Sequence, residues 1–156
     1  MNVTAYDIAE KFLGIKEIPG VGTNPWISAW LELSGAPHPA ADEISWCSGY
    51  CGFPFWILGI PVKLGLWARA WLTQGKAVAL ADAARGYDVV ILKRGGGDQP
   101  GADVIAAPGH VTLFSRLEGG SVYGLGGNQG NQVSVAPFPL DRVLGVRRLH
   151  ESGIAA

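Results

Sequence analysis

The pattern of hydrophobic and polar residues changes near residue 87, from helical spacing before it to strand-like runs after it. Apolar residues recur every three or four positions over 5–13, and Thr4 precedes them, so we expect a helix capped by Thr4. Asn24-Pro25 places a capping residue before a proline at the first helical position, which predicts a second helix over 25–33. The first half of the chain is therefore predicted to be helical.

Two more helices are expected before the change of pattern. The third spans about 46–58, and either Asp42 or Ser45 can cap it. Pro54 falls inside this segment, where a proline costs about 3 kcal/mol or kinks the helix, and a break near this point is the alternative. The fourth helix is short and covers about 67–74.

Strand-length runs separated by turn residues follow residue 87. The five expected strands cover 88–93, 110–115, 121–125, 132–135 and 143–147. Helices followed by an antiparallel meander indicate an α+β fold. The length of 156 residues fits one domain, so we expect residues 1–156 to form a single unit with its own core.

Composition excludes several classes of protein. Hydrophobic residues make up 48% of the chain and charged residues 16%, which excludes an intrinsically disordered chain. The formal charge is −1 and Arg147-Arg148 is the one visible basic pair, so we expect no nucleic-acid partner. The longest apolar stretch, 53–66, is interrupted by prolines, glycines and a lysine, which argues against stable membrane insertion. The N-terminus leads directly into an amphipathic segment, so we expect a protein made and held in the cytoplasm.

The chain has two cysteines, Cys47 and Cys51, and they lie one helical turn apart. Two cysteines are too few for a disulfide framework, and a bond across one turn would be strained, so we expect free thiols. A zinc site built on these cysteines and His110 would lack an evident fourth ligand. We therefore expect neither a metal nor another cofactor.

Cys47 is the candidate nucleophile. It falls in the first turn of the third predicted helix, where unpaired N–H groups and the helix dipole favour the thiolate. Gly49 and Gly52 on or beside the same face are expected to let this helix approach a sheet closely. The alternative is that Cys47 is a small buried hydrophobic residue, the commoner role of a lone cysteine.

His110 is the candidate general base. It begins a predicted strand directly after a Pro-Gly turn, so its imidazole is expected near a strand end, where it can take the proton of the thiol. His38 lies between two prolines and His150 lies in the tail, so His110 is the best candidate among three histidines. The alternative is a core or surface histidine without a catalytic role.

Asn128 is the candidate third member of a catalytic triad with Cys47 and His110. An amide oxygen there can accept a hydrogen bond from the second imidazole nitrogen and so fix the tautomer of His110. Asn beside Gly is also the ordinary composition of a β-turn. Gln129 is the second choice for this role, and Asn131 is a weaker one.

Several segments of the chain resemble a phage- and prophage-associated group of cysteine peptidoglycan hydrolases, which is allied to the NlpC-type and CHAP cell-wall peptidases. The resemblance extends over about residues 5–148 and is carried by segments 13–20, 24–27, 42–47, 68–72, 87–90, 109–111 and 125–129. It implies a papain-like α+β fold, with N-terminal helices packed on a C-terminal antiparallel sheet of about five strands. It further implies that the protein hydrolyses an amide bond in the peptide part of peptidoglycan.

The resemblance also assigns roles to individual residues. Carried over by position, Cys47 is the nucleophile, His110 the base and Asn128 the residue that orients it. The backbone N–H of Cys47 would hold the oxyanion, with Tyr50 or Ser45 as a further donor. Beside the nucleophile and base, Trp46, Tyr50 and Gln129 are expected to contact the substrate.

The leading hypothesis is thus a monomeric endopeptidase or N-acetylmuramoyl-alanine amidase acting on the peptidoglycan stem peptide, as a phage lysin (endolysin) or a bacterial effector. It would act in the periplasm or wall after release through a holin or a secretion system. One alternative is a non-catalytic module that binds the wall or a phage component. Another is a cysteine acyltransferase or deamidase on the same fold, because acyl transfer uses the same three residues.

Overall fold

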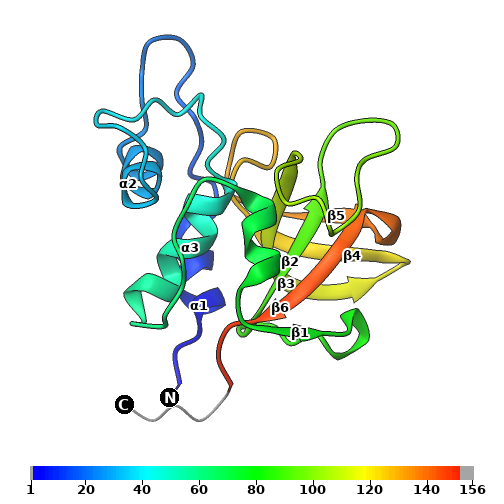
Figure 1. Cartoon of the computed structure of the whole chain (residues 1–156). Helices are drawn as coiled ribbons and strands as arrows, with labels where there is room; N and C mark the ends of the chain where they lie inside the picture. Colours follow the sequence, from blue (N-terminus) through cyan, green and yellow to red (C-terminus); the bar gives the residue numbers. More distant parts are fainter. Residues whose placement is uncertain (1, 152–156) are drawn as a thin grey trace.

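The computed structural model describes residues 2–151, and its helices gather on one side of a curled sheet (Figure 1). The helical elements, in chain order, are α1 (Ala5–Ala9), the 3-10 turn η1 (Glu10–Phe12), α2 (Pro25–Leu33), α3 (Cys47–Ile57) and the 3-10 segment η2 (Ala68–Thr73). Two further 3-10 turns, η3 (Leu80–Asp82) and η4 (Leu140–Arg142), lie between strands. The first two helices begin at the predicted residues, whereas α3 and the fourth segment begin one residue later than expected. The fourth segment is a 3-10 helix.

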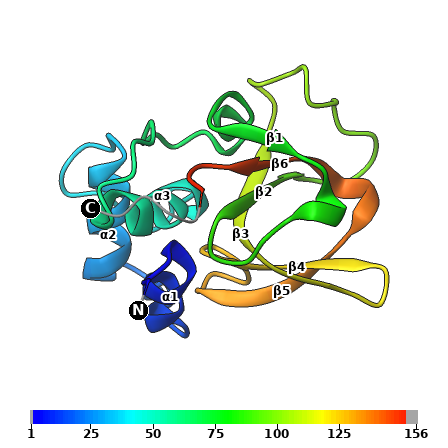
Figure 2. The ribbon, with the colours of Figure 1, turned by 90° about the horizontal axis from the view of Figure 1, so that it is seen from below.

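The sheet is antiparallel and has six strands in the order β1-β6-β2-β3-β4-β5. Their bounds are β1 (Lys76–Val78), β2 (Asp88–Lys93), β3 (Gly109–Glu118), β4 (Ser121–Gly126), β5 (Ser134–Pro139) and β6 (Val143–Arg148). Seen from below, the strands form a strongly curved sheet (Figure 2). A second, smaller cluster of apolar side chains packs within the sheet, apart from the helices. The α+β fold is confirmed, with one strand more than expected, because three residues of β1 are too few to show alternation.

Strand β2 is buried on both faces, which explains its unbroken apolar sequence. Val89 and Ile91 belong to the main core, which includes the helices. Val90 and Leu92 belong to a second, smaller core on the other face of the sheet. The alternation of side chains along a strand thus lets one strand support two cores.

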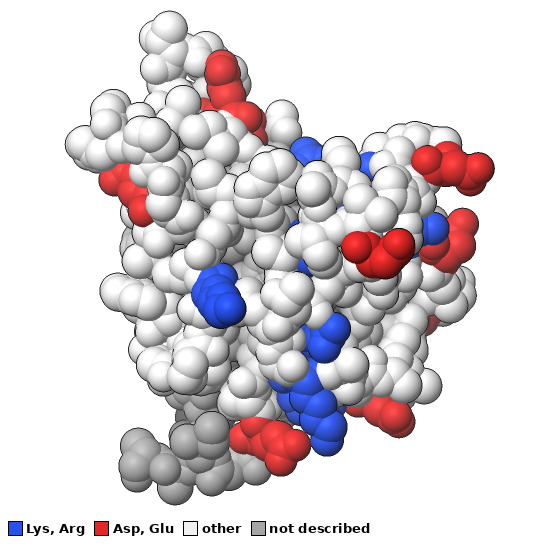
Figure 3. Space-filling model, viewed as in Figure 1, with Lys and Arg blue, Asp and Glu red and all other residues white. Residues whose placement is uncertain are grey.

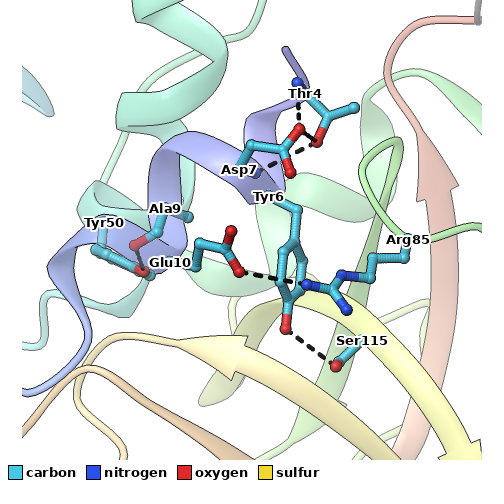
Figure 4. A network of polar contacts seen from close by, with 8 residues as sticks. All are labelled: Thr4, Tyr6, Asp7, Ala9, Glu10, Tyr50, Arg85 and Ser115. Atoms are coloured by element: carbon cyan, nitrogen blue, oxygen red, sulfur yellow. Dashed lines mark hydrogen bonds and ion pairs between the residues drawn. The ribbon is translucent and has the colours of Figure 1, made fainter. Parts of the chain in front are cut away.

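Helix α1 is fixed at its start and through one aromatic ring (Figure 4). Thr4 caps it as predicted, with the reciprocal capping-box bonds to Asp7. The hydroxyl of Tyr6 donates to Oγ of Ser115 on β3 at 3.0 Å, and the guanidinium of Arg85 lies 4.0 Å from the centre of the Tyr6 ring. A helix as short as α1 is not stable alone, so these contacts with the rest of the fold stabilise it.

The start of α3 differs from the prediction. Its N-cap is Trp46, and no side chain makes a capping hydrogen bond there. Asp42 is buried and instead accepts from the backbone N–H groups of Ile18 and Asn24, each at 3.1 Å. The carboxylate therefore ties the preceding loop to the start of α2, and the backbone N–H groups at the start of α3 receive no side-chain oxygen.

The glycines of α3 allow close packing, although against different neighbours than expected. A Cβ added to Gly49 would lie 2.7 Å from the carbonyl oxygen of Trp30, so this glycine brings α3 against the backbone of α2 and not against a sheet. A Cβ added to Gly52 would meet the end of the Leu64 side chain. Pro54 stays inside the continuous helix, so the alternative of a break near it is wrong.

Charged side chains are sparse on the face shown in Figure 3, and they form no extended basic area there. The surface also carries isolated exposed apolar side chains, which are normal in globular proteins. Within residues 2–151, none of the helices is both long enough and apolar enough to cross a bilayer.

We predict that Gly49→Ala destabilises the fold by about 1 to 3 kcal/mol, because the new methyl group meets a fixed backbone oxygen. This cost exceeds the gain in helix propensity, which is about 1 kcal/mol for Gly to Ala. Gly52→Ala is the matched control: it has the same propensity gain, and its neighbour is a side chain that can move. Urea denaturation measures both, and a Gly49→Ala protein as stable as the wild type would refute the packing described here.

Candidate active site

Cys47 is the first residue of α3, and its side chain is 1% exposed. The helix packs on β3, so its N-terminal end lies beside the sheet. The first N–H groups of a helix have no intrahelical partner and carry partial positive charge. The sulfur is therefore placed where a thiolate, and later an oxyanion, is stabilised.

His110 lies at the start of β3, opposite Leu92 of β2, and is 7% exposed. Its imidazole acts on the thiol of Cys47 and lowers the pKa of that thiol. Its Nε2 lies 2.9 Å from Oε1 of Gln129. The structure thus brings together the cysteine and the histidine that are remote in the sequence, and it adds an amide on the far side of the ring.

The amide of Gln129 determines the tautomer of His110. Its Nε2 donates to the carbonyl oxygens of Gly124 at 3.2 Å and of Ser134 at 2.7 Å, so Oε1 is the atom that faces the imidazole. An amide oxygen only accepts, so the imidazole Nε2 must carry the proton. The remaining nitrogen, Nδ1, then presents its lone pair to the thiol, as a general base requires.

The third residue of the constellation is therefore Gln129, and the assignment of this position to Asn128 is corrected. Asn128 has a φ of 57°, and it serves as a left-handed turn residue. Its amide is not among the groups that bond His110 within the described part of the chain. Asn131 has a φ of 59° and is an exposed turn residue as well. Gln129 follows the turn, and its longer side chain reaches the imidazole.

Trp46 and Tyr50 do not line the site, contrary to the prediction that they contact substrate. Both are fully buried. The hydroxyl of Tyr50 donates to the carbonyl oxygen of Ala9 at 2.8 Å, and Nε1 of Trp46 donates to Oε1 of Glu17 at 2.8 Å. Trp46 also stacks on Trp30 with ring centroids 5.8 Å apart. These aromatic residues belong to the core that fixes α3, and Tyr50 is not available to bind an oxyanion.

The environment favours ionisation of Cys47. Burial raises the pKa of the thiol, but the hydrogen bond and the charge of His110 act against it, helped by the backbone of Val111 and by Ser45. The net effect lowers the pKa of Cys47 to about 7, from 9.0 for a free thiol. Cys51, also a free thiol, is fully buried, and burial raises its pKa well above the ordinary value. One helix thus carries one activated and one inert cysteine.

Sequence reasoning did not single out Arg94 as part of the site. Its Nη1 donates to Oγ of Ser45 at 2.7 Å, and Oγ of Ser45 lies 3.8 Å from Sγ of Cys47. Arg94 is exposed, so it links the surface to the buried sulfur through one hydroxyl group. In the sequence, the position of Arg94 directly after the apolar run 88–93 was the signal that could have indicated its role.

Arg69 was also missed, and it holds the loop that leads to His110. It is fully buried, and its guanidinium donates to four carbonyl oxygens of the segment 100–108. One of these bonds, from Nε to the oxygen of Pro108 at 2.8 Å, lies directly before the strand that begins with Gly109 and His110. Buried charges normally require such partners. Arg69 therefore fixes the backbone from which the imidazole projects.

Two hollows of opposite charge meet at Gly130 beside the site. One, of about 480 Å³, is lined by His110, Gln129 and three cations. The other, of about 340 Å³, is lined by three carboxylates and by Lys16. Within residues 2–151, no three His, Cys, Asp or Glu side chains are grouped in a way that could hold a metal ion.

No protein-family model matches the chain, and no curated protein sequence matches it. Solved structures do resemble it. NlpC1 from Trichomonas vaginalis aligns with a TM-score of 0.56 and 20% identity over 93% of this chain and 42% of its own. The peptidoglycan hydrolase RipB from Mycobacterium tuberculosis aligns with a TM-score of 0.55 and 22% identity over 95% of this chain and 64% of its own.

The P60 domain of an antigen from M. avium subspecies paratuberculosis aligns with a TM-score of 0.52 and 18% identity, over 94% of this chain and 96% of that domain. The chain thus spans less than two thirds of NlpC1 and RipB and nearly all of the isolated P60 domain. At these identities the similarity is one of fold. The chain has the papain-like α+β fold of NlpC/P60 proteins.

We predict that the reactivity of Cys47 depends on His110 and Gln129 and not on Asn128. In the wild type, alkylation by iodoacetamide should increase with pH around a midpoint near 7, the pKa of Cys47. Removing the imidazole in His110→Ala leaves burial dominant, so the midpoint should move up. Gln129→Ala frees the imidazole to turn and should also move the midpoint up.

Asn128→Gly is the matched control for Gln129→Ala, because it removes the neighbouring amide and keeps a residue that tolerates the φ of 57°. Its alkylation midpoint should equal that of the wild type. Cys51→Ala separates the two thiols and should change little. A midpoint that moves in Asn128→Gly and not in Gln129→Ala would reverse the assignment.

Proposed function

We propose that this protein is a cysteine peptidase or amidase that hydrolyses an amide bond in the peptide part of peptidoglycan. One observation carries the proposal: the pKa of a thiol at a helix N-terminus is lowered by an imidazole, and Nε2 of that imidazole is held by a buried amide. This is the arrangement that nucleophilic acyl-transfer catalysis requires. RipB, which has the same fold, is described as a peptidoglycan hydrolase, which suggests the substrate.

In the proposed first step, Nδ1 of His110 takes the proton of Cys47, and the thiolate attacks the carbonyl carbon of the amide. The carbonyl oxygen becomes an oxyanion, which the N–H of Cys47 at the start of α3 stabilises. The imidazolium then gives its proton to the amine nitrogen, and the C–N bond breaks. The amine leaves, and the acyl group remains on sulfur as a thioester.

In the second step, water attacks the thioester with His110 as general base. The carboxylic product leaves, and Cys47 recovers its proton. Throughout both steps, Oε1 of Gln129 accepts from Nε2 of His110 and stabilises the imidazolium. The carbonyl groups that hold the amide of Gln129 keep it from turning.

The lowered pKa of Cys47 favours this hydrolase over the alternative of an inert binding module. A module that only docked on the wall would have no requirement for an activated thiol beside an oriented base. Burial alone would raise the pKa of Cys47, as it does for Cys51 in the same helix. Both cysteines are buried in the same helix, and only the one beside the imidazole has a lowered pKa, which supports catalysis.

We further propose that the protein is a phage-type lysin, made in the cytoplasm and acting on the wall after release through a holin or a secretion system. This proposal rests on the resemblance of its sequence segments to phage-associated hydrolases. Both an endopeptidase and an N-acetylmuramoyl-alanine amidase fit the proposed chemistry, because each cleaves an amide in the wall peptide.

We predict that Cys47→Ala abolishes hydrolysis of purified peptidoglycan, lowering the rate by at least about a thousandfold, because no other group replaces the nucleophile. The measurement is the release of new amino groups, with mass analysis of the fragments. Cys51→Ala is the matched control, since it removes the neighbouring buried thiol of the same helix and should keep most of the activity. Equal release by wild type and Cys47→Ala would end the proposal.

A further inference from the structure

The hollow beside His110 contains three cations and no carboxylate. Lys93, Arg94 and Arg142 line it together with the imidazole, and the ring of Phe138 forms an apolar wall 5.4 Å from that of His110 between centroids. Its volume of about 480 Å³ is sufficient for a small side chain or a short peptide segment. These cations differ from the thiol, imidazole and amide groups of Cys47, His110 and Gln129.

The positive charge of this hollow is not neutralised by the protein. Arg94 donates to the hydroxyl of Ser45, and Arg142 donates to the backbone oxygens of Lys93 and Gly95 at 2.8 to 3.2 Å. These partners are neutral, so they fix the guanidinium groups and leave their charge. No ion pair found within residues 2–151 involves any of the three cations. Like charges held together repel, and an anionic ligand would relieve that repulsion.

The position of the hollow identifies which part of a substrate it receives. The acyl part of the substrate must lie over Cys47, whereas the leaving amine must lie within reach of the imidazole that protonates it. The hollow is lined by His110 and not by Cys47. It therefore lies on the side of the leaving amine. The adjoining hollow is lined by Glu17, Asp42 and Glu43, and these carboxylates would repel an anion. The anionic end of a substrate would therefore be bound in the hollow beside His110 and not in the adjoining one.

We propose that Lys93, Arg94 and Arg142 bind a carboxylate carried by the residue on the amine side of the cleaved bond. The inference rests on the proposed function and narrows its substrate class to wall peptides with an anionic leaving group. Guanidinium groups suit this role because they bind carboxylates with two parallel hydrogen bonds. Phe138 contacts the apolar part of the same residue. The carboxylate is either the terminal α-carboxylate of that residue or one on its side chain.

The first test needs no hydrolysis and compares alkylation of Cys47 by iodoacetate, which is anionic, with alkylation by neutral iodoacetamide. Both rates are measured on the full chain, at a pH above the thiol pKa. Lys93→Met should lower the ratio of the iodoacetate to the iodoacetamide rate by about three- to tenfold, because one charge of the hollow is lost. Lys93→Arg, which keeps the charge, should restore the ratio.

Lys76→Met is the matched control, since Lys76 is exposed on β1 and lies outside the lining of this hollow. It should leave the ratio unchanged, and added salt should lower the ratio of the wild type. A ratio that is the same in wild type and Lys93→Met would overturn the proposal, whatever the protein does to peptidoglycan.

The second test uses purified peptidoglycan, either untreated or with its carboxylates capped as methylamides. Wild type should cleave the capped wall about tenfold less efficiently, mainly through KM, and Lys93→Met should discriminate less between the two. Mass analysis of fragments from partly capped wall then distinguishes the α-carboxylate from a side-chain carboxylate. Equal cleavage of both walls by wild type would overturn the carboxylate site and leave the proposed function standing. Failure to cleave either wall would contradict the proposed function, and the alkylation ratio would still decide whether the hollow binds anions.

Discussion

The interaction between Cys47 and His110 depends on how the N-terminal end of α3 is packed against the start of β3. Neither partner can be moved independently: Gly49 brings α3 against the backbone of α2, and the buried aromatic rings of Trp46 and Tyr50 fill the space around its first turn. On the other side, β2 and β4 pair with β3 and fix its register. The thiol and the imidazole therefore meet in a rigid frame, which is the condition for orienting a base without a further cost in entropy.

Buried polar groups complete this frame. Gln129 is held by two backbone carbonyl groups, so that its oxygen faces His110, and Arg69 gathers the loop before β3 through its carbonyl oxygens. Both side chains donate to backbone carbonyl oxygens, which gives fixed positions to side chains that are otherwise flexible. The cations around the hollow, of which Arg94 is exposed and Lys93 and Arg142 are half-buried, lie outside this frame. The catalytic groups and the proposed substrate contacts thus come from different parts of the molecule.

The sequence predicted those features of the structure that depend on interactions between neighbouring residues, such as helix caps and helix starts. Thr4 as a cap, Asn24-Pro25 as a helix start and Cys47 in a first turn each depend on a few neighbouring residues. Contacts at a distance were harder to predict. Asn128 and Gln129 carry the same amide group, and only the turn conformation decides which of them reaches the imidazole. Residues 47–52 of α3 are buried on every side, so the hydrophobic pattern does not show which face of the helix is turned to the active site. The prediction that Trp46 and Tyr50 lie on that face was therefore wrong. Arg69 acts only through a loop some distance along the chain.

The proposed catalysis depends most directly on Sγ of Cys47 as the atom that takes the acyl group, and trapping the intermediate tests this claim. Wild-type protein is mixed with soluble peptidoglycan fragments and quenched in acid within the first turnover, and the adduct is located by fragmentation mass spectrometry. We predict a wall peptide joined to Sγ of Cys47 as a thioester that hydroxylamine removes. Turnover without an adduct at Cys47, or an adduct at Cys51 instead, would contradict it.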